Sequence, residues 1–182
     1  MLRRFGQGAT VLCAVAIMGC SAGSDLTTPR PNAAAQTLSA RTVRQERVTG
    51  SATILLPLFG NAQERYSLSA IRQSDGSVNG EFEEFSEQEG GQRIHARVYC
   101  FTVTGNSARL AARIDQTNVS FGPVGSYVVW SLRDNGEGAN APPDETTDIF
   151  FGGTQAQADT HCRTGFPLTP YYPSIRGNLQ VE

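Results

Sequence analysis

The strongest constraint on the fold is an alternation of short β-prone runs with glycine turns that continues from residue 47 to residue 182. Runs rich in Val, Ile, Tyr, Phe and Thr between such turns are typical of antiparallel strands joined by hairpins. No segment has the apolar spacing of a convincing amphipathic helix. The pattern therefore predicts an all-β domain over residues 47–182, a single antiparallel β-sandwich or closed barrel of about seven or eight strands.

The longest run, QRIHARVYCFTVT at residues 92–104, changes its buried face part of the way along. In its first half the apolar side chains stand at even-numbered positions, Ile94, Ala96 and Val98. In its second half they stand at odd-numbered positions, Tyr99, Phe101 and Val103. Because strand side chains alternate between faces, a β-bulge near Val98–Tyr99 is needed to keep one core face. The alternative is a strand buried on both faces at its far end. The Gly105-Asn106 pair that follows predicts a two-residue hairpin turn.

The acidic run GEFEEF precedes this long strand and predicts a hairpin with it. If the buried faces are matched so that Phe82 lies across from Ile94, Glu83 falls opposite Arg93 and Glu81 opposite His95. Opposite charges across a solvated sheet face support pairing by a few tenths of a kcal/mol to about 1 kcal/mol. A glycosidase instead needs two carboxyl groups that face each other across a cleft. The run is therefore predicted to form solvated cross-strand pairs.

The first nineteen residues have the features of an export signal. Two arginines, at positions 3 and 4, precede a short apolar run that ends at Gly19. A charged start, an apolar stretch of about 7–15 residues and a small residue before the cut define such a signal. The run is too short to span a bilayer, which takes about 20 apolar residues. Residues 1–19 are therefore predicted to be a signal peptide.

The end of this signal, Ile17-Met18-Gly19-Cys20, resembles the lipobox of bacterial lipoproteins. The resemblance implies cleavage before Cys20, a diacylglyceryl group on its thiol, and a mature chain tethered to a membrane by lipid. Several acyl chains, at about 0.8 kcal/mol per buried methylene, anchor a protein stably where one chain does so only marginally. Ser21 after the cysteine, in place of Asp, implies the outer membrane in a cell that has one. The alternative is an ordinary signal and a free secreted protein.

Residues 20–46 hold few large apolar groups and show no periodicity. Such a segment buries too little surface to offset its ordering entropy, so it is predicted to be a flexible, lipid-anchored tether. The remaining residues, 47–182, are enough for one domain with one core. All 15 basic residues are arginine and the formal net charge is −2. This balance gives no broad basic face, which excludes nucleic acid as a partner.

Cys100 and Cys162 are the two cysteines of the predicted β domain. In an exported domain two such thiols are expected to form a disulfide, with two buried free thiols as the alternative. In a reduced chain His95 and His161 could join them in a zinc site or a Cys-His nucleophile, but no CxxC or HxxxH spacing supports zinc. No nucleophile-elbow or metalloprotease motif is present. The chain is therefore predicted not to be an enzyme.

The stretch DNGEGANAPPDE at residues 134–145 is rich in acidic side chains. Calcium takes six to eight oxygen ligands, and this region offers five candidate ligands: Asp134, Asn135, Glu137, Asp144 and Asp148. The spacing does not match an EF-hand loop, and Asp-Asn-Gly followed by Pro-Pro is typical of a turn. The stretch is predicted to be a structural turn, with a calcium-stabilised β domain as the alternative. No other cofactor is expected.

Arginines recur on single faces of two predicted strands. Arg93 and Arg97 share one face of the first, and Arg109 and Arg113 share one face of the second. Guanidinium groups match phosphates and the acidic groups of glycans, so these residues are candidates for anion binding. The alternative is a solvated face with local acidic partners.

Three blocks of the predicted domain together resemble a family of exported bacterial β domains that has no established activity. The shared pattern, V-x-C-x-x-V-x-G-N-x-A, then V-x-D-N-G-E-G with a following P-D, a late cysteine and a final G-N-x-x-V, covers about residues 47–182. It falls on these positions: Val98, Cys100, Val103, Gly105, Asn106, Ala108, Asp134–Gly138, Pro143, Asp144, Cys162, Gly177, Asn178 and Val181. Leu132 departs from it where the family has valine. The resemblance implies an all-β fold and paired cysteines, and it adds no substrate or cofactor.

These observations together predict an exported, lipid-anchored protein of the bacterial cell envelope. Its β domain is expected to have a non-catalytic binding or structural role. The membrane, through the N-terminal lipid, and an envelope protein or a glycan are the expected partners. The alternatives are the calcium-stabilised domain and, with less support, an envelope hydrolase. A fold alone does not identify a ligand.

Overall fold

The structure is a computed structural model, and it describes residues 45–151, 153–165 and 168–182. The predicted signal peptide, Cys20 and nearly all of the predicted tether lie outside these residues. The first strand begins at Arg47, the first residue of the predicted β domain.

The described residues form ten strands and one α-helix. The strands are β1 (Arg47–Leu56), β2 (Ala62–Arg72), β3 (Val78–Ser86), β4 (Gln92–Thr104), β5 (Ser107–Thr117), β6 (Tyr127–Arg133), β7 (Glu145–Thr147), β8 (Phe150–Phe151), β9 (Tyr171–Pro173) and β10 (Arg176–Val181). The helix is α1 (Gln155–Thr164), and 3₁₀ turns lie at Pro57–Phe59 and Gln88–Gly90.

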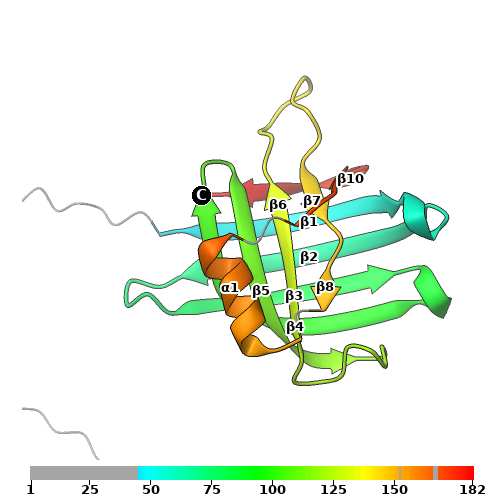
Figure 1. The fold of residues 1–182 in the computed structure, drawn as a ribbon. Helices are drawn as coiled ribbons and strands as arrows, with labels where there is room; N and C mark the ends of the chain where they lie inside the picture. Colours follow the sequence, from blue (N-terminus) through cyan, green and yellow to red (C-terminus); the bar gives the residue numbers. More distant parts are fainter. Residues whose placement is uncertain (1–44, 152, 166–167) are drawn as a thin grey trace, which may run out of the picture. The chain divides into compact units, whose positions relative to one another are not determined.

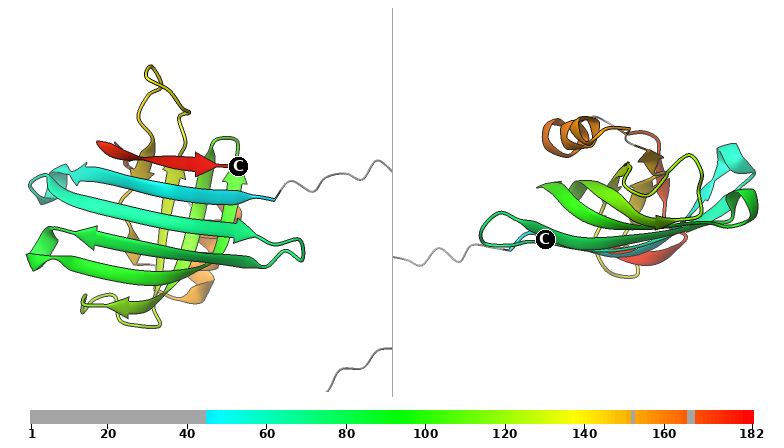
Figure 2. Two further views of the ribbon diagram at one scale, coloured as in Figure 1. Left: turned by 180° about the vertical axis from the view of Figure 1, so that it is seen from behind. Right: turned by 90° about the horizontal axis from the view of Figure 1, so that it is seen from below.

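All described strands belong to one antiparallel sheet in the order β10-β1-β2-β3-β4-β5-β6-β7-β9, with β8 paired to β6. The sheet curls into a half-barrel in which β1, β2 and β3 run at a steep angle to β6, while β4 and β5 stay paired from end to end (Figures 1 and 2). The all-β prediction is thus confirmed. The prediction of a sandwich or closed barrel of about seven or eight strands was wrong on two points, because the sheet is an open half-barrel and has ten described strands. Strands β7, β8 and β9 are too short to show the alternation of apolar and polar residues from which strands are predicted.

Bulges bend the strands at the centre of the sheet. The β4–β5 register shifts between His95 and Ala96 and again between Val98 and Cys100, which leaves Tyr99 without a cross-strand partner. The predicted bulge at Val98–Tyr99 is therefore confirmed, and it returns the following apolar residues to the inner face. Tyr99 and Cys100 instead pack on the outer face of the sheet. The predicted two-residue turn is also confirmed, because Thr104 pairs with Ser107.

The predicted register of the β3–β4 hairpin was wrong by two residues. Phe82 pairs with Ala96, Glu83 with His95, and Glu81 with Arg97. The turn takes up more residues than expected because Gln88–Gly90 form a 3₁₀ turn that ends at Gly91. A shift of two keeps every side chain on its predicted face. It also sets a small residue across from the Phe82 ring.

Helix α1 was not predicted. It begins with a capping box: the Thr154 hydroxyl accepts from the backbone N–H of Gln157, and the side-chain oxygen of Gln157 accepts from the backbone N–H of Thr154. The helix ends at Gly165. Its buried residues are Ala158, His161 and Cys162. So small an apolar face gives little helical periodicity, and the capping box was the sequence signal that marked its start.

Two apolar clusters lie on opposite faces of the sheet. The larger fills the concave side, where Tyr66, Phe82 and Trp130 form a chain of rings with centroid separations of 5.6 and 4.1 Å. The smaller lies between the outer face and α1, and it includes Ala111 and Val129. Strands β5 and β6 are therefore buried on both faces. Backbone hydrogen bonds of 2.9 Å between the two ends of the domain, Arg47 and Glu182, close β1 against β10.

Candidate functional site

Three carboxyl groups meet at the concave side of the sheet, and we refer to Glu64, Glu84 and Asp148 as the acid cluster. Glu64 on β2 is 1% exposed and Glu84 on β3 is 4% exposed. Glu84 pairs directly with Tyr66 of β2, whose hydroxyl donates to Glu64 Oε1 at 2.5 Å. Asp148, between β7 and β8, is partly exposed. The acid cluster therefore lies at one end of the aromatic chain of the core.

Burial and mutual repulsion hold these acids towards their neutral forms. Burial first, then the charges of Asp148 and Glu84, raise the pKa of Glu64 to about 10. Burial also raises the pKa of Glu84 to about 7 and raises the pKa of Asp148. Desolvation of this kind always disfavours the charged form of a carboxyl group.

We assign a shared proton to the two glutamates of the acid cluster, held on Glu64. Oε2 of Glu64 and Oε2 of Glu84 are both buried without a hydrogen-bond partner among the described residues. Burial raises the pKa of Glu64 to about 10 and that of Glu84 only to about 7, so near neutral pH the proton stays on Glu64. A protonated carboxyl group can donate to a neighbouring carboxylate, and the interaction with Glu64 lowers the pKa of Glu84 against the larger effect of burial.

The two glutamates of the acid cluster are buried too deeply to act as a glycosidase pair. A glycosidase pair must be reached by substrate from both sides, and Glu64 and Glu84 are closed off by the packed sheet. The acidic residues of β3 were predicted to be solvated. Glu81 and Glu83 are exposed as predicted, whereas Glu84 is buried. Glu84 shares the parity of Phe82, so strand alternation was the signal that could have revealed it.

The acidic loop between β6 and β7 closes an edge of the sheet. Asp144, 5% exposed, accepts from the backbone N–H of Asn135 at 2.8 Å and from that of Leu179 at 2.7 Å. Asp134 accepts from Gly136 at 2.8 Å and from Val181 at 3.0 Å. Two aspartates thus cap backbone donors of β10 that no further strand pairs. An exposed row of such donors invites pairing with other chains.

The five predicted calcium ligands do not share one position. Glu137 Oε1 accepts from the side chain of Asn178 at 2.8 Å, and Asn135 donates from its side chain to the carbonyl of Pro143 at 2.8 Å. Asp148 belongs to the acid cluster instead. Within residues 45–182, apart from the undescribed positions, no three His, Cys, Asp or Glu side chains are arranged to hold a metal ion. Calcium stabilisation stays a prediction, which thermal melts with calcium and with chelator test.

We expect Asp144→Ala to lower the free energy of unfolding by about 3 kcal/mol, because it removes two hydrogen bonds to a buried carboxylate. Urea unfolding measures this, with Glu137→Ala as the control on the same loop, expected to change stability by less than about 0.5 kcal/mol. Equal, small losses in both variants would contradict the capping role. A melting temperature that rises with calcium in the wild type and not in Asp144→Ala would favour the calcium alternative.

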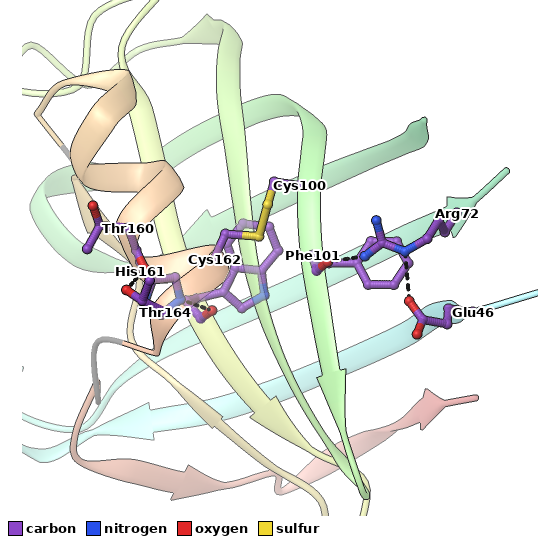
Figure 3. The surroundings of a disulfide bond; sticks show 9 residues. Glu46, Arg72, Cys100, Phe101, Thr160, His161, Cys162 and Thr164 are labelled. Carbon is purple, nitrogen blue, oxygen red and sulfur yellow. Dashed lines mark hydrogen bonds and ion pairs between the residues drawn. A yellow bond between two sulfur atoms is a disulfide. The ribbon is translucent and has the colours of Figure 1, made fainter. Parts of the chain in front are cut away.

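The predicted disulfide is present between Cys100 on β4 and Cys162 on α1, with a Cα–Cα distance of 6.2 Å (Figure 3). Beside it, His161 Nε2 donates to the carbonyl of Trp130 at 2.9 Å, because a carbonyl oxygen only accepts. Both contacts attach α1 to the sheet. With both sulfurs bonded to each other, neither a Cys-His nucleophile nor the four-residue zinc site with His95 can form in this state.

Arg72 forms a second group of contacts near this bridge. Its guanidinium pairs with Glu46 at 2.7 Å, donates to the carbonyl of Phe101 and lies 4.8 Å from the centre of the Phe101 ring (Figure 3). The last residues before β1 are thereby joined to β4.

The outer-face arginines separate into different surroundings. Arg97 pairs across the strands with Arg113 and forms an ion pair with Asp115 at 3.5 Å. Arg93 lines an open groove of about 910 Å³ across β2–β5, where its guanidinium and that of Arg65 lie 5.3 and 5.4 Å from the Phe85 ring centre. Arg109 lies elsewhere, in a smaller cavity at the end of α1.

No helix within the described residues is both long enough and apolar enough to cross a membrane. No known protein family, no curated protein and no solved structure matches the chain.

Proposed function

We propose that this chain is an exported bacterial lipoprotein. In this proposal residues 1–19 direct export, Cys20 carries the lipid, residues 20–46 form a tether, and the β domain is displayed at the cell envelope. The β domain acts without catalysis, as a binding or structural module. Its partners are the membrane, through the lipid, and an envelope protein or glycan.

The Cys100–Cys162 bridge is the observation that carries the proposal. Disulfides persist in oxidising compartments and are rare in the cytosol, which agrees with the export signal and lipobox resemblance of the N-terminus. Enclosure of the acid cluster supports the non-catalytic role, because its two glutamates are out of reach of a substrate. The open groove beside Phe85 supports a role in binding, since pockets and grooves with convergent polar groups are where ligands bind.

Acylation at Cys20 is tested by substitution of that residue in the producing cell. Wild-type chain should incorporate labelled palmitate and sediment with membranes, whereas Cys20→Ala should lose the label and leave the membrane fraction, because one thiol carries the anchor. Cys13→Ala, inside the predicted signal, is the matched control and should remain labelled. Label retained in Cys20→Ala, or absent from the wild type, rejects the lipoprotein proposal.

A further inference from the structure

A small cavity of about 270 Å³ lies where the ends of β4, β5 and β6 meet the segment after α1. Its polar lining comes from seven residues: Thr104, Ser107, Arg109, Ser131, Arg133, Thr169 and Tyr171. None of the residues that line it is acidic. About 10–15 Å³ of such space is already enough for one water molecule, so the cavity has room for several atoms of a ligand. It suits a small ligand and not a folded partner.

Arg109 is the group in this cavity that lacks a counter-charge. Its Nε atom is buried without a hydrogen-bond acceptor, and no carboxylate among the described residues pairs with its guanidinium. A Cβ atom at Gly165 would lie 3.2 Å from Arg109 Nη1. The glycine that ends α1 thus leaves room for the guanidinium. A buried donor left without an acceptor costs about 1–3 kcal/mol, more when the group is charged.

Arg133 is held in a fixed position on the other side of the cavity. Its Nη1 atom pairs with Glu145 at 3.1 Å, and its guanidinium lies 3.8 Å from the centre of the Tyr171 ring. Glu145 balances this second charge, so one positive charge in the cavity remains unbalanced. The hydroxyl groups of Ser107 and Ser131 come from the strand positions that pair with Arg133 and Arg109.

We infer that this cavity binds an oxyanion, the phosphate or carboxylate group of a small ligand, with Arg109 as its main partner. A guanidinium presents a fork of donors that fits either group, and serine and threonine hydroxyls complete the set of hydrogen bonds. The inference rests on the proposed binding role of the β domain and gives its ligand a chemical class. It also accounts for Arg109 better than the predicted shared site with Arg113, which lies outside this cavity.

The test is calorimetric titration of the purified full-length mature chain in detergent, at constant ionic strength held with sodium chloride. Inorganic phosphate is one probe and glucuronate, a sugar carboxylate, is the other. The wild type should bind at least one of them saturably, and the responding probe identifies the oxyanion. Arg109→Ala should weaken that binding about tenfold or more, as expected for loss of a charged hydrogen-bond donor. Arg113→Ala, on the same face of the same strand, should stay within twofold.

Absence of saturable binding to both probes overturns the inference. Equal losses of affinity in Arg109→Ala and Arg113→Ala also overturn it, because they would indicate only a general electrostatic attraction of the anion to the protein. If Arg109→Ala fails to fold, the wild type alone decides through its NMR spectrum. Amide shifts at Ser107, Arg109 and Ser131 should then saturate with the probe, and shifts confined to other strands would reject the site. The Cys20 labelling result is independent, so a failed cavity and a failed lipoprotein proposal are distinguishable.

Discussion

Reduction of the Cys100–Cys162 bridge is expected to lower the free energy of unfolding by about 4 kcal/mol. The bridge closes a loop with a sequence separation of 62 residues, and a loop of that length loses about this much conformational entropy in the unfolded state when it is crosslinked. Urea unfolding with and without reductant measures the change. Cys100→Ser/Cys162→Ser should match the reduced wild type and should not respond to reductant.

The same reduction is expected to free α1 before the sheet unfolds. A helix of ten residues is marginal by itself, and the buried apolar residues that it contributes to the small outer cluster are Ala158 and Cys162. Hydrogen exchange should therefore show α1 amides unprotected in the reduced chain while β2 and β3 amides stay protected. An unchanged urea midpoint, together with α1 amides as protected as those of β5, would contradict this account of the bridge.

Stability is expected to fall as the pH rises from about 5 to 8. A carboxyl group whose pKa is higher in the folded state holds its proton longer there than in the unfolded chain. Its stabilisation is complete below the ordinary pKa of 4.5 and is lost as the pH rises through the raised values, about 7 for Glu84 and about 10 for Glu64. Each proton bound only by the folded state changes the free energy of unfolding by about 1.4 kcal/mol per pH unit.

Glu64→Gln is expected to remove much of this pH dependence of stability. It should also stabilise the domain at pH 8 by about 2 kcal/mol or more, which is the effect of one such proton over about one and a half pH units. The amide oxygen still accepts from Tyr66 and the amide nitrogen donates to Glu84, so the contacts of the protonated acid are kept without a titrating group. Thermal melts in matched buffers from pH 5 to 8 measure the effect. Glu83→Gln, on the exposed face of β3, should reproduce the wild-type slope. A wild-type stability that is flat or rises with pH, or a Glu64→Gln slope equal to it, would contradict the shared-proton assignment.

The parts of the fold that depend on local alternation could be predicted from the sequence. The bulge at Val98–Tyr99 followed from a change of parity, and the Gly105-Asn106 turn followed from its two residues. The pairing of Cys100 with Cys162 followed from the small number of thiols in a chain that is predicted to be exported. Each of these inferences needed only neighbouring residues or a count.

The parts of the fold that depend on contacts between distant residues could not be predicted from the sequence. The β3–β4 register is set by the size of the turn and by the fit of Phe82 against Trp130, neither of which alternation specifies. Helix α1 is held by a disulfide and a histidine instead of an apolar stripe, so its periodicity is weak. Asp134 and Asp144 were correctly assigned to a turn, but their role on the backbone of β10 requires the two ends of the sheet to meet.

The acid cluster shows the same limit. Alternation places Glu64 beside Tyr66 and Leu68, and it places Glu84 beside Phe82, so the sequence does hold the signal that both glutamates face the core. Their meeting with Asp148 comes only from the curl of the sheet. Glu64 is tolerated in the core because its raised pKa keeps it protonated at neutral pH, which removes its charge.

Non-reducing mass spectrometry of the protein purified from the cells that produce it tests the central claim most directly. The account predicts a mature N-terminus at Cys20 that carries acyl chains, together with a crosslinked peptide that joins Cys100 to Cys162. An intact N-terminus with an unmodified Cys20, and both later cysteines as free thiols, would contradict it.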